Sequence, residues 1–424
     1  RHPGVAQAAV VVRESQQGDK QLVGYVVPKP DVAVADAGAQ VDEWRHLYDH
    51  SYADSGDEVL GEDFQGWNSS YTGEPIPREQ MLEWQDAAVA QVVRFAPRRV
   101  LEIGVGSGLL LAKIVGEVEE YWGTDISATV VDRVRAQAEQ AGYGDRVRLS
   151  AQPADDVSGL PQGRFDTVVL NSVVQYFPSV EYLDRVLRQV RELLVPDGRV
   201  IVGDVRNAMT RSLFQTAVQR AAHPHASQEE LRTLVKRELL AERELVIAPE
   251  WFTEWAADTS AAVDIRLKPG RARNELTRHR YEVVLHKQPA DVLDLAGVPS
   301  VPWGREVYDM PGLGRHADRA GGPVRVTGIP NARLAEEIAV TVAAGLLDPA
   351  SPPGEPVDPQ ELLGWAAEHG RDAILTLSGE DARCFDAVLL PVGQTGRRTV
   401  SGAFVPRGAG AVSYTHLRAH ETVL

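Results

Sequence analysis

A glycine-rich turn is the part of the chain best suited to hold a ligand through its backbone. Gly104, Gly106 and Gly108 stand at alternate positions between the apolar run 99–103 and the run that begins at Leu109. Glycine permits a tight turn and lets a ligand approach the main chain closely, and the N-terminus of a following helix offers free N–H groups. This pattern predicts a cofactor-binding turn between a strand and a helix.

The residue types around this turn distinguish two kinds of cofactor. A dinucleotide site uses Gly-x-Gly-x-x-Gly and directs a helix N-terminus at pyrophosphate, but Leu109 occupies the position of the last glycine. Glu102 immediately precedes the turn, and a carboxylate there would repel pyrophosphate and attract a cation. S-adenosylmethionine carries an ammonium and a sulfonium, so we predict this cofactor. A nicotinamide-dependent dehydrogenase is the alternative from another enzyme class.

Further residues lie where the rest of the cofactor would bind. Asp125 follows the first glycine by about 20 residues, at the end of a second predicted strand, where an acidic side chain can accept both ribose hydroxyls. The alternative is an N-cap for the next helix, a role that Ser127 can fill instead. Ile126 is assigned to the same site. Ala154 and Asp155 follow the third strand and are candidates for adenine binding, although aspartate in a turn commonly caps its own backbone.

These residues depend on an alternation of strands and helices. We predict strands over residues 99–103, 121–125, 146–150, 165–170, 199–203 and 281–286, and helices over 109–118, 128–141 and 180–194. This alternation indicates an α/β fold with a Rossmann-like, doubly wound and mostly parallel sheet.

Other segments flank this region. Residues 5–12 and 21–27 predict a hairpin, and because two strands alone are marginal we expect a sheet completed elsewhere. Residues 28–40 predict a linker. Beyond Lys287 we expect two more βα-like units, with strands at 323–328, 373–377 and 387–390 and helices at 331–344 and 359–369. Residues 412–424 resemble translated adaptor or vector sequence, the alternative being a genuine tail.

Composition narrows the function classes. The 424 residues carry a formal net charge of −16, which argues against a nucleic-acid partner. The single cysteine, Cys384, excludes an intrachain disulfide and a cysteine zinc cluster, and His223 and His225 resemble no metal site. No apolar run reaches the roughly 18 residues of a membrane span, and no secretion signal is visible, so we expect no membrane partner and a cytoplasmic protein. The chain begins at Arg1 and looks like a piece of a longer protein.

Several blocks together resemble the N-methyltransferase domain that is embedded in adenylation domains of nonribosomal peptide synthetases. They include Asn171-Ser-Val-Val-Gln-Tyr-Phe-Pro178 and Asn274-Glu-Leu-Thr-Arg-His-Arg-Tyr281, with further blocks at 66–77, 81–84, 99–104 and 203–206. Residues 2–5 and 22–27 resemble the hairpin of an adenylation domain's small C-terminal subdomain, and 325–334 and 385–388 resemble the segment that follows the methyltransferase. The resemblance covers roughly residues 1 to 390.

The resemblance implies a class I methyltransferase flanked by small α+β pieces of the adenylation subdomain. It divides the chain into a partial subdomain at 1–31, the methyltransferase at 41–287, a post-methyltransferase segment at 288–400 and the tail at 412–424. The large adenylation core, the closing lysine segment and a carrier domain of a whole module are absent from the sequence, so we expect no adenylation activity from this chain. The expected partners are the rest of the adenylation domain and a carrier domain with a phosphopantetheine aminoacyl thioester.

The implied reaction is methylation of the α-amine of that thioester. An α-amine has a pKa near 7.7–8, so alignment of the groups matters more than a strong base. Asp204 is the leading candidate to accept a proton, and an ion pair with Arg206 is its structural alternative. Gln175 and Tyr176 can orient the amine, although Tyr176 can equally be a core aromatic, and Asn171 is placed to contact the methionine part of the cofactor.

Two aromatic residues ahead of the first strand, Trp67 and Tyr71, are predicted to form a lid over the cofactor, with helix packing as the alternative. His279 is expected on the surface rather than in catalysis. Two other functions within the same cofactor class stay open. One is an O- or C-methyltransferase acting on a small or tethered substrate, and the other is a truncated fragment that binds S-adenosylmethionine without catalysing transfer.

Overall fold

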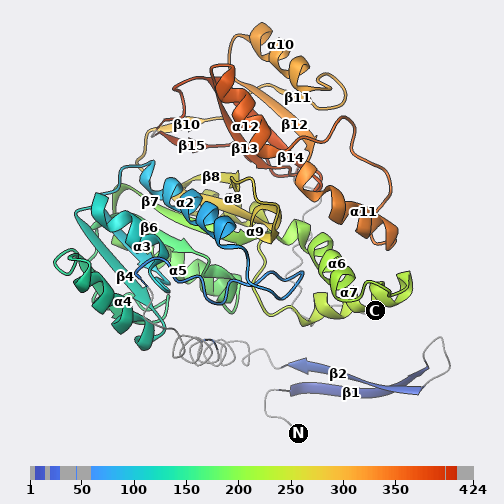
Figure 1. Ribbon diagram of the computed structural model, residues 1–424, viewed down its shortest axis with the longest axis horizontal. Coiled ribbons are helices and arrows are strands. Elements are labelled where there is room, and N and C mark those ends of the chain that lie inside the picture. Colours follow the sequence, from blue (N-terminus) through green and yellow to red (C-terminus); the bar gives the residue numbers. More distant parts are fainter. Residues whose placement is uncertain (1–4, 15–19, 29–43, 45–58, 397, 408–424) are drawn as a thin grey trace.

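The computed structural model describes residues 5–14, 20–28, 44, 59–396 and 398–407 (Figure 1). The predicted linker beyond Pro28 and the predicted tail lie outside this part of the chain. Within it, no helix has the length and apolar character that crossing a membrane requires. The same residues contain no group of three or more His, Cys, Asp or Glu side chains that could hold a metal ion.

The amino-terminal hairpin is confirmed. Strands β1 (Val5–Glu14) and β2 (Lys20–Pro28) pair antiparallel over almost their whole length. Among the described strands, none joins them to make the larger sheet that we expected.

The central sheet has seven strands in the order β5-β4-β3-β6-β7-β9-β8. Their bounds are β3 (Arg99–Ile103), β4 (Glu120–Asp125), β5 (Val147–Ala151), β6 (Phe165–Asn171), β7 (Leu194–Arg206), β8 (Ala262–Leu267) and β9 (Arg280–His286). The first five run parallel, and β9 runs antiparallel to both β7 and β8. This arrangement confirms the predicted α/β fold and its mostly parallel sheet. Strand β8 was not predicted.

Helices cover both faces of this sheet. Helices α2 (Arg78–Val93), α3 (Leu109–Ile114) and α4 (Ala128–Gln140) share one hydrophobic core with the sheet, and α5 (Val180–Leu193) and α8 (Pro249–Thr259) share the other. Helix α5 shows why these segments fold as they do. Its residues Leu183, Val186, Leu187 and Val190 recur at helical spacing and are fully buried, and Ser179 caps its N-terminus.

Three helices that were not predicted surround the end of the sheet. Helices α6 (Arg211–Ala222) and α7 (Gln228–Ala241) pack against each other after β7, and the short helix α9 (Glu275–His279) leads into β9. Ser227 and Glu230 form a reciprocal capping box at the start of α7. These helices stand beyond the carboxyl end of β7 and bring polar side chains to that edge.

The carboxyl-terminal part forms a second sheet, in the order β11-β12-β14-β13. Its elements are β10 (Val292–Asp294), β11 (Ser300–Pro302), α10 (Met310–Ala320), β12 (Val324–Pro330), α11 (Ala335–Ala343), α12 (Pro359–Glu368), β13 (Arg371–Leu377), β14 (Cys384–Pro391) and β15 (Thr399–Ser401). The predicted strands and helices of this part are all present, as β12, α11, α12, β13 and β14, but they do not form two successive parallel βα units. Helices α11 and α12 both lie between β12 and β13 in the chain, and β14 pairs antiparallel with β12 and β13.

Contacts cross the boundary predicted at Lys287. Helix α11 packs against α6, and strand β8 lies next to β13 and β15 (Figure 1). Arg333, just before α11, donates hydrogen bonds to the carbonyl oxygens of Lys268, at 2.9 Å, and Gly270. His286 Nδ1 lies 2.9 Å from Thr399 Oγ1. The part of the chain beyond residue 287 is therefore packed on the central sheet.

Candidate active site

The glycine turn forms one wall of a cavity of about 490 Å³ at the carboxyl end of the parallel strands. Gly104 and Gly106 line it, and both have positive φ angles of 81° and 50°. A Cβ atom at Gly104 would come within 2.7 Å of the Val173 side chain, so a larger residue would disturb this wall. Gly108 was predicted to bind the cofactor, but it lies outside the lining and instead lets α3 approach Leu60.

Two carboxylates stand at the strand ends beside this turn. Glu102 is 2% exposed and accepts a 2.6 Å hydrogen bond from the Tyr121 hydroxyl. Burial raises the pKa of Glu102 to about 8, and the nearby charge of Asp125 adds to this shift. A cationic ligand in the cavity would offset both effects. These two carboxylates therefore fit the ammonium and sulfonium of S-adenosylmethionine better than a pyrophosphate.

Asp125 lies where the sequence predicted it, at the end of β4 and in the cavity wall. Its Oδ2 accepts a hydrogen bond from Gly106 N at 2.9 Å, and its Oδ1 accepts one from Ser127 N at 3.0 Å. Ser127 is the N-cap of α4, so Asp125 is not needed for that role. A carboxylate oxygen has two acceptor sites, so these two contacts are compatible with hydrogen bonds from hydroxyl groups of a ligand.

The residues assigned to the adenine end separate into two groups. Ile126 and Ala154 line the cavity. Asp155 lies outside the lining, because its Oδ1 accepts a 2.7 Å hydrogen bond from the Tyr182 hydroxyl and its Oδ2 lies 3.6 Å from Arg185. The geometry corrects the prediction that the Asp155 carboxylate contacts adenine.

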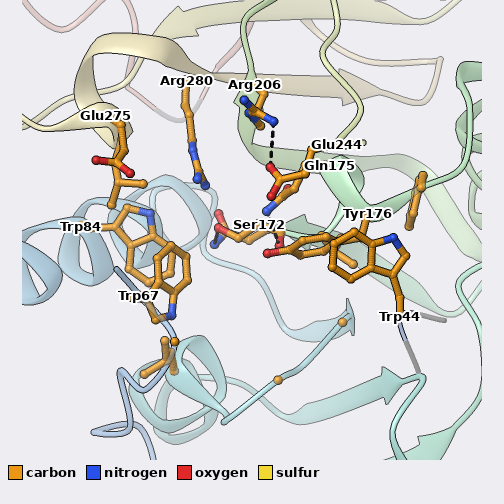
Figure 2. Close-up of a pocket in the computed structure, with 18 of the residues that line it drawn as sticks. Trp44, Trp67, Trp84, Ser172, Gln175, Tyr176, Arg206, Glu244, Glu275 and Arg280 are labelled. Atoms are coloured by element: carbon orange, nitrogen blue, oxygen red, sulfur yellow. Dashed lines mark hydrogen bonds and ion pairs between the residues drawn. The ribbon is translucent and has the colours of Figure 1, made fainter. Parts of the chain in front are cut away.

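Of the two aromatic residues predicted to form a lid, only Trp67 lies at the cavity. Trp67 lines the cavity, with its ring 4.5 Å from that of Trp84 on α2 (Figure 2). Tyr71, predicted as a cofactor contact, lies outside the lining. Its hydroxyl donates a 2.6 Å hydrogen bond to Glu337 on α11, and its ring meets that of Phe214 edge-on. Tyr71 therefore joins two parts of the chain.

Asn171, Gln175 and Tyr176 all line the opposite wall. Asn171 ends β6, and Gln175 and Tyr176 belong to the short 3₁₀ helix that follows. Gln175 Nε2 donates a 2.9 Å hydrogen bond to the Ser172 carbonyl oxygen. The ring of Tyr176 lies 4.7 Å from that of Trp44, so these two aromatics stand together at the cavity (Figure 2).

Asp204 was predicted to accept a proton from the substrate, and the structure contradicts this role. Its side chain is fully buried, Oδ1 lies 2.8 Å from Lys268 Nζ, and Oδ2 accepts hydrogen bonds from Ser172 Oγ and Arg280. Burial opposes ionisation, but the Arg280 and Lys268 cations outweigh it and hold the pKa of Asp204 well below its usual range. Asp204 also lies outside the cavity lining. Such a carboxylate is a weak base.

The alternative prediction for Asp204, an ion pair with Arg206, was also wrong, because Asp204 pairs with Lys268 and Arg280. Arg206 pairs with Glu242 and Glu244, which follow α7 and were not singled out in the sequence. All three residues line the cavity. Glu242 and Glu244 belong to a polar run without periodicity, so only the folded structure brings them to the site.

His279 was expected on the surface, but it is 6% exposed and lines the cavity. Its Nδ1 lies 3.0 Å from Thr210 Oγ1, and its Nε2 lies 2.7 Å from Glu337 Oε2. Glu275, in the same block of sequence, also lines the cavity and accepts hydrogen bonds from the backbone and hydroxyl of Ser70. The block 274–281 that carried part of the family resemblance was the available signal for both.

The chain is similar in sequence to known proteins. Residues 101–200 match the methyltransferase domain family. The chain is 43% identical over 388 residues to the probable non-canonical nonribosomal peptide synthetase CymA of Salinispora arenicola (strain CNS-205), which covers 92% of this chain and 5% of that protein. It is 35% identical over 366 residues to the chondramide synthase cmdD of Chondromyces crocatus, covering 80% and 9% of the two proteins.

A similar solved structure is the magnesium protoporphyrin IX methyltransferase ChlM from Synechocystis PCC 6803 with bound SAH. It is 16% identical, covers 61% of this chain and 98% of that chain, and gives a TM-score of 0.37. The chain spans less than one tenth of the length of either sequence relative named above.

The strand order, the glycine turn and the domain match together define a class I methyltransferase that uses S-adenosylmethionine. This sets aside the dehydrogenase alternative. More particularly, the methyltransferase is one related to those found within nonribosomal peptide synthetases, since the similarity to such synthetases extends on both sides of the matched domain.

Proposed function

We propose that this methyltransferase methylates the α-amine of an aminoacyl thioester carried on the phosphopantetheine of a carrier domain, in nonribosomal peptide biosynthesis. The observation that carries the proposal is the extent of the similarity to a named synthetase, which covers 92% of the chain and so reaches well beyond residues 101–200. In such an assembly the acceptor is presented on a carrier domain, and the remainder of the adenylation domain is a neighbour.

The cofactor half of the proposal assigns roles to residues of the cavity wall. S-adenosylmethionine supplies an electrophilic methyl group on a sulfonium. The Glu102 carboxylate balances positive charge on this ligand, Gly104 and Gly106 let it approach the backbone, and Asp125 accepts hydrogen bonds from its ribose hydroxyls. Three further wall residues complete the assignment: Ile126 and Ala154 at the adenine and Asn171 at the methionine end.

At the acceptor end, Gln175 and Tyr176 orient the amine toward the methyl group. Because a neutral amine is already nucleophilic, holding it in line with the methyl carbon and the sulfur supplies much of the acceleration. Asp204 acts indirectly: it fixes Arg280, which lines the cavity, and Ser172 next to Gln175.

The proposal is tested by incubating the chain with S-adenosylmethionine and a panel of aminoacyl carrier thioesters, with intact mass and fragmentation as the readout. We expect one added methyl group located on nitrogen. Methylation confined to oxygen or carbon would overturn the proposal in favour of the other acceptor classes. Cofactor binding by calorimetry without any transfer would instead support a non-catalytic fragment.

A further inference from the structure

The acceptor end of the cavity holds a carboxylate that is contacted through only one of its two oxygens. Arg206 meets Glu242 with a two-pronged contact, Nη1 to Oε1 and Nη2 to Oε2 at 3.0 Å each, and both side chains are 12% exposed. Although burial opposes ionisation, Arg206 lowers the pKa of Glu242 below its usual range. The guanidinium charge is thus matched by Glu242. Glu244 reaches the same guanidinium through one oxygen, Oε2, at 2.9 Å (Figure 2).

Glu244 is also the more accessible of the two carboxylates. Its side chain is 33% exposed, against 12% for Glu242, and it lines the cavity. Arg206 contacts only Oε2 of Glu244, so Oε1 of this carboxylate can accept a hydrogen bond from a group that enters the cavity. A positively charged group entering from the acceptor side would be attracted to it.

A second observation comes from Gln175, which is 2% exposed in the cavity wall. Its Nε2 faces the Ser172 carbonyl oxygen, and because a carbonyl can only accept, the amide orientation is determined. Its Oε1 is buried and has no hydrogen-bond partner among the described residues. An unpaired buried amide oxygen is costly, so this atom is prepared for an N–H or O–H donor.

The two observations meet at one place. The main-chain N–H of Leu245 donates a 2.7 Å hydrogen bond to the main-chain carbonyl oxygen of Gln175. Leu245 follows Glu244 directly, so this bond holds the two segments together. Figure 2 shows the Glu244 and Gln175 side chains together, beside Arg206 and across from Trp67 and Trp84. A carboxylate oxygen and an amide oxygen, both acceptors, are therefore offered to the same part of the cavity.

We propose that Glu244 and Gln175 Oε1 form the recognition site for the acceptor amine, which is bound first as an ammonium ion. The inference rests on the proposed function and names the residues that carry its nitrogen specificity. The ammonium donates one N–H to Glu244 and one to Gln175, and its third proton passes to solvent. The neutral nitrogen then forms the N–C bond as the C–S bond breaks, with the electron pair of that bond staying on sulfur. The product is an N-methyl ammonium, and the overall reaction releases one proton.

This pair also explains selection of nitrogen over oxygen. A hydroxyl has one proton and no charge, so it can satisfy only one of the two acceptors and leaves the other without a hydrogen-bond donor. An ammonium satisfies both. Sites whose buried polar groups are left unpaired by the wrong ligand discriminate strongly against it.

The test compares Glu244→Gln with Glu242→Gln, using an aminoacyl carrier thioester and the matching α-hydroxyacyl carrier thioester. For Glu244→Gln we expect the KM for the aminoacyl substrate to rise by at least about tenfold, because a charge-assisted hydrogen bond is lost. The preference for amine over hydroxyl should fall by a similar factor, and the affinity for S-adenosylmethionine measured by calorimetry should stay the same. Gln175→Met, which keeps the side-chain size, should raise the same KM.

Glu242→Gln distinguishes a role of Glu244 in recognising the amine from a role in holding Arg206. If Glu244 serves only to hold Arg206, then removing the more buried, two-pronged Glu242 should raise KM at least as much as Glu244→Gln does, and that result would overturn the inference. An unchanged KM in both Glu244→Gln and Gln175→Met would do the same. These outcomes differ from failure of the proposed function, in which the unaltered chain transfers no methyl group to nitrogen.

Discussion

The Tyr71 hydroxyl donates a 2.6 Å hydrogen bond to Glu337 Oε1, joining residues that are 266 positions apart in the chain. Tyr71 precedes the central sheet, and Glu337 belongs to α11 of the carboxyl-terminal part. The same carboxylate lies 3.1 Å from Arg278 and 2.7 Å from His279, which lines the cavity. One buried side chain of the post-methyltransferase segment thus holds three residues around the active site.

This relationship predicts a large effect of Glu337→Gln on stability. Removing Glu337 from this buried ion pair leaves Arg278 only the exposed Glu336 as a counterion, so the free energy of unfolding should fall by about 3 kcal/mol. Urea denaturation measures it. The matched control is Glu336→Gln on the same helix: its side chain is 83% exposed and 3.5 Å from Arg278, and its loss should cost less than about 0.5 kcal/mol. Equal losses in the two variants would contradict the special role of Glu337.

Asp204→Asn tests whether this residue is structural. Asp204 has a φ angle of 65°, a conformation that asparagine tolerates, so the substitution isolates the charge. We expect a loss of about 3 to 5 kcal/mol in the free energy of unfolding, since Lys268 and Arg280 lose a shared partner. The pH profile of kcat/KM around neutrality should keep its shape.

The sign of the Asp204 effect also follows from its pKa. Because that pKa is lowered in the folded state, the stabilisation is present above the ordinary value of 3.8 and is lost as pH falls through the folded-state value. Acid unfolding of the unaltered chain and of Asp204→Asn should therefore converge at low pH. If Asp204→Asn were as stable as the unaltered chain but its kcat/KM profile had lost a titration, Asp204 would be the proton acceptor after all.

Glu102 should make cofactor affinity depend on pH. With a pKa of about 8 in the ligand-free protein, Glu102 must lose a proton before it can balance a cation. The affinity for S-adenosylmethionine should then increase by up to about tenfold per pH unit between about pH 6 and 8, with proton release detectable by calorimetry in two buffers. Glu102→Gln should flatten this dependence. The cofactor's own α-amine titrates equally in both proteins, so the ratio of their affinities isolates Glu102.

The same shift has a consequence for the ligand-free chain. A carboxyl whose folded-state pKa is raised favours the folded state most at low pH, and this contribution is lost as pH rises from the ordinary value of 4.5 toward 8. If Glu102→Gln removed no pH dependence from either binding or unfolding, the Glu102 carboxyl would not titrate in this pH range.

Asp125→Asn should weaken binding of S-adenosylmethionine by at least about tenfold, because a charged acceptor for the ribose hydroxyls is lost. Calorimetry measures it, with Asp132→Asn on α4 as the control, since the Asp132 side chain is 74% exposed and pairs with Arg135 at the surface. Unchanged affinity in Asp125→Asn would show that the ribose assignment is wrong.

The cofactor half of the site could be predicted because its signals are local. A strand, a glycine turn and a helix follow one another within residues 99–114, and Glu102 and Asp125 are placed by the ends of adjacent parallel strands. The errors arose where a predicted site residue forms a hydrogen bond with a side chain far away in the sequence. Asp155 is bonded to Tyr182 and Tyr71 to Glu337, and no local pattern indicates either partner.

The acceptor half depends on contacts between segments far apart in the sequence. Asp204 lies near the end of the apolar strand β7, which continues to Arg206, and its partners Lys268 and Arg280 follow β8 and begin β9. Strand β8 itself was missed, so the antiparallel end of the sheet that carries these cations could not be anticipated. Glu244 reaches the cavity because helices α6 and α7 are inserted after β7.

The packing of β13 and β15 beside β8, and of α11 against α6, bears on how this methylating unit would be transplanted between assembly lines. A graft whose junction falls at residue 287 would cut away Glu337 and Arg333, leaving Arg278 and the backbone at Lys268 uncapped. A donor segment that extends through β15 keeps these contacts, and its chimeras should unfold at a higher temperature than chimeras joined at residue 287.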